Sequence, residues 1–179
     1  MTKATYLDAH EKHKVRQFLL SKFKFEQVVG LPGPDFNTYV ESLVKYGAKQ
    51  FDLYEYSPSV LVRQLAMAKH PVNMHIGDIL QADSNRSKTL FDLDFCVTAT
   101  SCKEHINKFT NNFIMTFSRR DRYDNPINVF VRAKNQTIDR LITLFEPIKH
   151  SIIETKEGDS YIYVEYHDTS SMCCIAKIN

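Results

Sequence analysis

Short apolar segments alternate with helical periodicity over most of the chain, and this alternation restricts the fold more than any other feature. Four helical patterns accompany the apolar segments, at 5–22, 35–46, 58–69 and 101–110. The apolar segments are bounded by turn residues, which is typical of buried strands, and they lie at 25–31, 49–57, 72–79, 90–98 and 112–118. Strands joined through helices pair in parallel by right-handed crossovers. The sequence therefore predicts an α/β fold with a doubly wound, mainly parallel sheet flanked by helices.

The last part of the chain departs from this alternation. "SYIYVEYHD" (160–168) and "SMCCIAKI" (171–178) are separated by too few residues for a crossover, so we expect a C-terminal antiparallel hairpin. The segment 119–135 is expected to be irregular. The spacing of four apolar residues then predicts a helix that ends before Pro147, and these residues are Ile138, Leu141, Ile142 and Phe145.

Length and composition indicate one soluble domain. The 179 residues suit a single domain 1–179, with an N-terminal helix 1–22 and a core 23–179. A net charge of +2 permits an anionic partner without requiring one. The four cysteines form neither a disulfide framework nor a zinc pattern, and we predict no metal site. With no apolar run long enough for a membrane span, a cytoplasmic protein is expected.

Three predicted strand ends carry residues suited to a nucleoside cofactor. "VVGLPG" (28–33) closes the first strand, and its glycines Gly30 and Gly33 would let a ligand approach the backbone at a helix N-terminus. Glu55 ends the second strand, where an acid can accept hydrogen bonds from ribose hydroxyls. Asp78 ends the third strand, where it can meet an adenine amino group. Singly, each is better explained as a packing turn, a solvated acid or a turn former. Together they favour a cofactor site.

The order of "VVGLPG", "DLYEYS", "HIGDI" and "FDLDFC", followed by a fifth strand and a terminal hairpin, resembles class I S-adenosylmethionine-dependent methyltransferases over roughly residues 23–179. The resemblance implies a Rossmann-like sheet and S-adenosylmethionine as the cofactor, and the cation-rich segment 118–136 makes nucleic acid the favoured methyl acceptor. By the same resemblance Gly30 and Gly33 would pass the methionine part, Glu55 the ribose and Asp78 the adenine. The family usually has an acid two residues before its first glycine, where this chain has Val28.

The fourth predicted strand, "FDLDFCVT", places Asp92 and Asp94 on one face. In base-amino methyltransferases an acid at this position presents the target amine, and the resemblance leaves the register open, with Asp94 slightly favoured over Asp92. The usual prolines are absent. Cys96 offers an alternative as a nucleophile towards a pyrimidine, although a buried structural thiol is the better interpretation.

"SRRDRYDNPINVFVRAKNQ" (118–136) mixes cations and aromatic side chains in a way that suits phosphate contacts and base stacking. A solvated loop, partly neutralised by its own acids, is the ordinary alternative. The N-terminal cations Lys12, Lys14, Arg16, Lys22 and Lys24 could extend this basic surface, but an exposed helix face is the more usual interpretation. The substrate-binding candidates are Arg119, Arg120, Arg122 and Tyr123, with Phe130, Arg132 and Lys134 further along.

Two other functions remain open from the sequence. The chain could be a methyltransferase fold without catalysis that binds nucleic acid or a protein partner, which Val28 and the missing prolines favour. It could also be an enzyme that consumes a related nucleoside cofactor without methyl transfer. Because the chain has no separate recognition domain, a homo- or hetero-oligomer could complete its substrate site.

Overall fold

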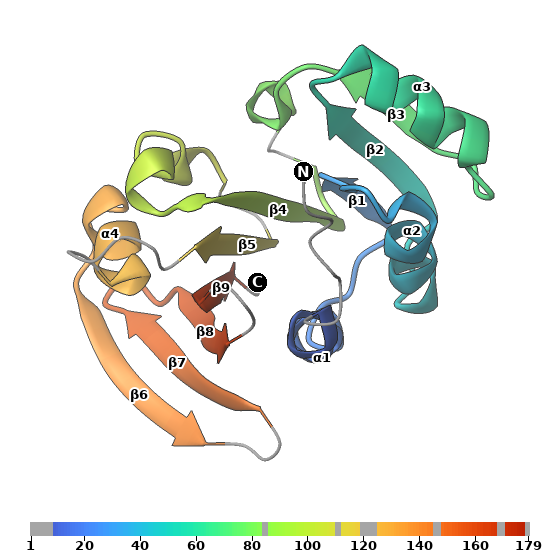
Figure 1. The fold of residues 1–179 in the computed structure, drawn as a ribbon. Coiled ribbons are helices and arrows are strands. Elements are labelled where there is room, and N and C mark those ends of the chain that lie inside the picture. Colours follow the sequence, from blue (N-terminus) through green and yellow to red (C-terminus); the bar gives the residue numbers. More distant parts are fainter. Residues whose placement is uncertain are drawn as a thin grey trace.

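The computed structural model describes residues 9–83, 86–109, 112–118, 125–144, 148–167 and 171–177. These residues form one nine-stranded mixed sheet in the order β3-β2-β1-β4-β5-β9-β8-β7-β6 (Figure 1). The strands are β1 Gln27–Gly30, β2 Gln50–Glu55, β3 Asn73–Ile76, β4 Thr89–Thr98, β5 Phe113–Ser118, β6 Ile138–Leu144, β7 Lys149–Thr155, β8 Ser160–His167 and β9 Ser171–Lys177. The helices are α1 Ala9–Leu20, α2 Phe36–Lys45, α3 Pro58–Met67 and α4 Pro126–Ala133, with 3-10 turns η2 Ile79–Gln81, η3 Thr100–Cys102 and η4 Ile106–Lys108.

Strands β1 to β5 form the parallel half of the sheet. β1 lies between β2 and β4, so the direction in which the sheet grows reverses beside β1. Gly30, the last residue of β1, is in register with Leu53 of β2 and Asp92 of β4. In open α/β sheets a ligand binds beyond the carboxyl ends of the strands at such a reversal. The doubly wound, mainly parallel sheet expected from the sequence is confirmed.

Strands β6 to β9 form an antiparallel meander that joins the parallel half through β9 and β5. The expected C-terminal hairpin is β8–β9, and its prediction is confirmed. The helix predicted for the segment that begins at Ile138 is wrong, because residues 138–144 form strand β6. β6 pairs with β7 from Ile138↔Thr155 to Leu144↔Lys149, and β7 was not predicted at all.

The prediction of an irregular segment over 119–135 is also wrong for residues 126–133, which form α4. The side chain of Asn125 accepts a hydrogen bond from the Ile127 N–H, and Pro126 stands in the first turn, which together begin the helix. The expected helix at 101–110 is replaced by η3 and η4. α4 buries Phe130 against the rings of Phe113 and Tyr161, so Phe130 cannot stack on a base as expected.

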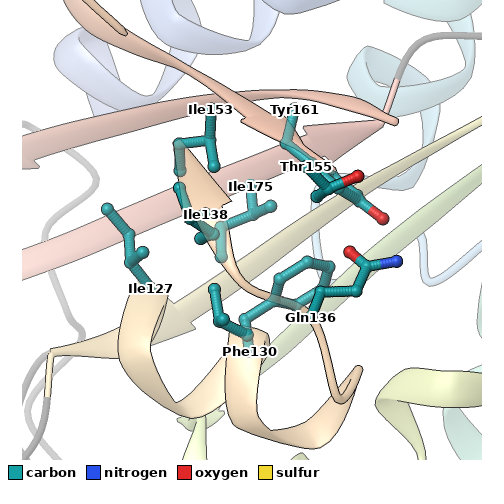
Figure 2. Close-up of a pocket in the computed structure, with 9 residues that line it drawn as sticks. Ile127, Phe130, Gln136, Ile138, Ile153, Thr155, Tyr161 and Ile175 are labelled. Atoms are coloured by element: carbon teal, nitrogen blue, oxygen red, sulfur yellow. The ribbon is translucent and has the colours of Figure 1, made fainter. Parts of the chain in front are cut away.

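Both faces of the sheet are covered at its centre, as β4 shows. Adjacent residues of β4 point to opposite faces, Leu90 towards α1 and α2 and Phe91 towards η4 and α4. Each such side chain contributes about 1.5–3 kcal/mol when it is buried completely. Between α4 and the meander, mostly apolar side chains surround a cavity of about 10 Å³ (Figure 2). That volume is about one water-sized probe, so the cavity is packing space and not a ligand site.

Lys134 follows α4 and turns inward instead of into solution. Its ammonium donates to the Phe109 carbonyl at 2.9 Å and lies 5.9 and 5.8 Å from the ring centroids of Phe113 and Phe130. Burial, and secondly the positive charge of Lys177, lower the pKa of Lys134 from about 10.5 to about 8. Lys134 is therefore partly buried with its ammonium against the core, and we no longer assign it to a phosphate-binding surface.

The lowered pKa predicts a specific pH dependence. Between about pH 8 and 10 the unfolded chain binds more protons at Lys134 than the folded chain does, so the free energy of unfolding should rise with pH over this range. Replacing Lys134 with Met removes that contribution. In urea unfolding between pH 7.5 and 9.5, we expect the free energy of unfolding of wild type to rise relative to that of Lys134→Met. The control is Lys45→Met, at an exposed lysine, and relative to this variant wild type should show no such rise. Equal pH profiles for wild type and Lys134→Met would contradict the assignment.

Candidate functional site

The carboxyl edge of the parallel half brings together the three strand ends singled out in the sequence. Gly30 ends β1, Glu55 ends β2, and Asp78 follows β3 by two residues. The Gly77 N–H donates to the Glu55 carbonyl at 3.1 Å, which holds the β3 turn against the end of β2. The Leu31 N–H donates to the Asp92 carbonyl at 3.3 Å, so the loop after β1 stays attached to β4.

The two acids at this edge shape their own turns. One carboxylate oxygen of Glu55 accepts the Ser57 N–H at 3.0 Å, and one oxygen of Asp78 accepts the Leu80 N–H at 2.8 Å. Between these acids in the chain stands Tyr56, whose side chain is 67% exposed. Slight burial and then the Asp78 carboxylate raise the pKa of Tyr56. Sequence reasoning missed Tyr56, although an aromatic residue directly after a candidate ribose acid was a usable signal.

The loop between β1 and α2 exposes backbone at Gly33. Its φ of +64° is in the left-handed region that favours glycine, and a Cβ there would meet no atom within 4 Å. The Gly33 carbonyl accepts a hydrogen bond from the Gln64 amide at 2.9 Å. Gln64 is 2% exposed, and its amide oxygen has no hydrogen-bond partner among the residues that the structure describes. A buried acceptor of this kind needs a donor.

Gly30 serves a different purpose from Gly33. A Cβ at Gly30 would lie 2.1 Å from the Tyr39 hydroxyl oxygen and 3.4 Å from the Asp92 carbonyl oxygen. Tyr39 of α2 therefore packs directly on the Gly30 backbone. Burial raises the pKa of Tyr39 well above its usual value, and the negative charge of Asp92 raises it further.

Asp92 is sealed beneath α1. Arg16 donates two hydrogen bonds to its carboxylate, at 2.9 and 2.5 Å, and the Asp92 side chain is 1% exposed. Burial by itself would lower the pKa of Arg16, but the Asp92 carboxylate outweighs this effect and raises it above its usual value. The Arg16 guanidinium also lies 5.4 Å from the centre of the Tyr39 ring. Asp92, Arg16 and Tyr39 thus form one buried cluster beside Gly30.

Asp94 lies two residues after Asp92 on β4 and contacts the ammonium group of Lys12. Lys12 lies one turn before Arg16 on α1. The Asp94 side chain is 18% exposed and that of Lys12 is 31% exposed, so solvent reaches this pair. The interpretation of α1's charges as an exposed face is therefore wrong for Lys12 and Arg16. Of the two acids left open by the sequence, Asp94 is the accessible one.

The remaining sequence candidates are only partly described. Arg119, Arg120, Arg122 and Tyr123 lie outside the described residues, and so does the side chain of Cys96.

Near the end of β4, a hollow of about 200 Å³ is lined by Thr100, Lys103, Val129 and Arg132. In the described ranges no group of three His, Cys, Asp or Glu side chains is placed to hold a metal ion. The described helices include none long and apolar enough to cross a membrane.

The Tyr39 contact predicts that Gly30→Ala destabilises the fold even without a ligand. Overpacking of this kind costs about 1–3 kcal/mol. Tyr39→Phe removes the hydroxyl oxygen that the new methyl group would meet, so Gly30→Ala should cost less in that background. Urea unfolding of wild type, both single variants and the double variant measures the difference. An equal cost in the two backgrounds would show that the Tyr39 hydroxyl does not set the requirement for glycine.

Solved methyltransferase structures are similar to almost the whole chain. The N-methyltransferase NodS from Bradyrhizobium japonicum, in complex with S-adenosyl-L-homocysteine, has a TM-score of 0.54 at 11% identity, covering 96% of this chain and 88% of that one. The SAM-dependent O-methyltransferase from Thermotoga maritima has a TM-score of 0.51 at 9% identity, covering 95% of this chain and 66% of that one. No protein-family model and no curated protein matches the chain.

At these identities the likeness concerns the fold. In this chain that fold consists of a parallel sheet that reverses beside β1 and an antiparallel C-terminal section joined to β5 through β9. The chain therefore has the fold of the class I S-adenosylmethionine-dependent methyltransferases.

Proposed function

We propose that this protein is an S-adenosylmethionine-dependent methyltransferase. The observation that carries the proposal is the meeting of the Gly30–Gly33 loop, Glu55 and Asp78 at neighbouring strand ends. By the family resemblance the loop would pass the methionine part, Glu55 would hold the ribose and Asp78 the adenine. The fold, which the chain shares with known methyltransferases, supports the same conclusion.

The residues present fit this cofactor. Glu55 would accept hydrogen bonds from the ribose hydroxyls, and Asp78 would accept one from the adenine amino group, with the exposed Tyr56 ring available to the base. The open space at Gly33 would admit the methionine part at the turn of the loop, whereas the Tyr39 hydroxyl lies against Gly30. The buried amide oxygen of Gln64 lies beside that loop and accepts no hydrogen bond from the described residues. A donor on the bound cofactor would satisfy it. When bound, S-adenosylmethionine supplies an electrophilic methyl group on a positively charged sulfur.

The chain's own contribution to such a reaction is positioning. Asp94 would orient the acceptor nitrogen by accepting a hydrogen bond from it, which aligns its lone pair for in-line transfer. A carboxylate at this point also stabilises the positive charge that develops on the nitrogen. Asp92 is committed to Arg16. We therefore assign it to positioning the end of β4 and not to contact with the acceptor.

Nucleic acid is the acceptor class that we propose. Lys103 and Arg132 place two cationic side chains around the hollow near the end of β4, with Thr100 as a further hydrogen-bonding group. Cationic and hydroxyl side chains are the usual phosphate contacts of nucleic-acid-binding proteins. Arg119, Arg120, Arg122 and Tyr123, which precede Asn125 in the sequence, remain proposed substrate contacts.

A non-catalytic binding protein is the second candidate. Val28, where the family usually has an acid, is fully buried in the core. The Tyr39 hydroxyl occupies the space next to Gly30, and Arg16 neutralises Asp92. These features favour a domain in which part of the cofactor site has been replaced by packing, so cofactor binding is the property to measure first.

Calorimetric titration with S-adenosylmethionine and S-adenosylhomocysteine tests the proposal. We expect micromolar binding by wild type and at least tenfold weaker binding by Glu55→Ala, because the ribose would lose its acceptor. Glu41→Ala, at an exposed position of α2, is the matched control and should bind like wild type. No heat with either ligand from folded wild-type protein would exclude the methyltransferase proposal and favour the binding protein.

The acceptor class is tested separately by fluorescence anisotropy with a labelled single-stranded RNA oligonucleotide at several salt concentrations. If Lys103 contacts a phosphate, Lys103→Glu should weaken binding and reduce the slope of log K against log salt by about 0.7. Lys69→Glu is the control for net charge. Lys69 pairs with Glu41 and is not among the residues that line this hollow. Equal losses in both variants would mean that the hollow is not a phosphate site.

A further inference from the structure

The acid assigned to the acceptor already holds an amine of this chain. Lys12 presents its ammonium group to Asp94, and both side chains reach solvent. We propose that Lys12 is itself a methyl acceptor, so that the protein modifies its own N-terminal helix. This inference rests on the proposed function, because it requires S-adenosylmethionine as the methyl donor.

The position of Lys12 is fixed by its helix. One turn further along α1, Arg16 makes two hydrogen bonds to Asp92. Val15 and Leu19, at 2% and 0% exposure, bury the same helix against the sheet. Because the helix is anchored, it holds the Lys12 amine next to Asp94. The effective concentration of this amine at Asp94 is therefore higher than that of an amine that diffuses in from solution.

The register of the sheet places this amine at the proposed cofactor edge. Asp92 is paired with Gly30, the last residue of β1, so Asp94 stands two residues beyond the paired end of β1. The loop that would pass the methionine part begins at this point, and its Leu31 N–H is bonded to the Asp92 carbonyl. The Lys12–Asp94 contact and the start of that loop are thus set by the same short stretch of β4.

The chemistry of the step balances without another reagent. The ammonium of Lys12 first releases a proton to water, which reaches this partly exposed pair. The nitrogen lone pair then forms a bond to the methyl carbon, the carbon–sulfur bond breaks, and its electron pair stays on sulfur as a neutral thioether. Positive charge passes from sulfur to nitrogen, where the Asp94 carboxylate stabilises it. The methylated lysine keeps its charge and its ion pair.

Mass spectrometry of the full chain incubated with S-adenosylmethionine tests the inference. We expect the mass of one methyl group to be added to wild type, with peptide mapping assigning it to Lys12. Lys12→Arg should take up none, and Asp94→Asn should slow the uptake at least tenfold. Lys14 is the control within the same helix, because it is 48% exposed and pairs with Glu11 at 3.5 Å instead of with β4.

A second readout does not depend on methyl transfer. The rate at which an acetylating reagent modifies Lys12 and Lys14 is measured with and without S-adenosylhomocysteine. Bound ligand next to Asp94 should slow acetylation of Lys12 severalfold and leave that of Lys14 unchanged. Urea unfolding of Lys12→Arg and Asp94→Asn verifies that both variants fold.

The outcomes separate the two proposals. Calorimetric binding of the cofactor without methylation of Lys12, or without its protection, overturns self-methylation and leaves the proposed function standing. Equal methylation of Lys12 and Lys14 also overturns it, since contact with Asp94 would then give Lys12 no advantage in methylation. Absence of any cofactor binding overturns both.

Discussion

The buried ion pair between Arg16 and Asp92 is the interaction on which the arrangement of the site depends. Removing two charges from water costs free energy that their attraction only partly returns, so such a pair adds little net stability. Breaking it would nevertheless leave an uncompensated buried charge, at a cost of about 3–5 kcal/mol. The pair therefore acts mainly as a positional constraint. It fixes α1 over the end of β4, and α1 also packs on β8, so one helix spans the parallel and antiparallel halves.

Two glycines of one loop illustrate how a motif can combine structural and ligand-binding requirements. Gly33 needs a left-handed backbone and leaves open space, as a ligand-binding loop would. Gly30 lacks a side chain because Tyr39 occupies that position from within the protein. Glycine is therefore required at the two positions for two different physical reasons, internal packing at Gly30 and backbone conformation at Gly33. The acids at the neighbouring strand ends carry more information about a ligand than the glycines do.

The sequence predicted the parallel half and its strand ends well because those elements are local apolar runs bounded by turn residues. It failed where the pattern was ambiguous or the partner was distant. The segment from Ile138 has helical spacing, yet pairing with β7 decides its conformation, and periodicity does not reveal a partner strand. Asn125-Pro126 carries the same kind of helix-start signal as Ser57-Pro58 at the beginning of α3, and it was passed over. The contact of Arg16 with Asp92 joins residues 76 positions apart, which no local pattern encodes.

The division of the sheet into a parallel half and a meander has a consequence for how the chain folds. Strands β6 to β9 pair with their neighbours in sequence, so closing each loop costs little entropy. β1 instead pairs with β4, whose residues lie about 60 positions later, as Gln27 opposite Thr89 illustrates. Topologies rich in such distant contacts fold more slowly. We therefore expect the meander to form first and the carboxyl edge that carries the candidate site to be completed last.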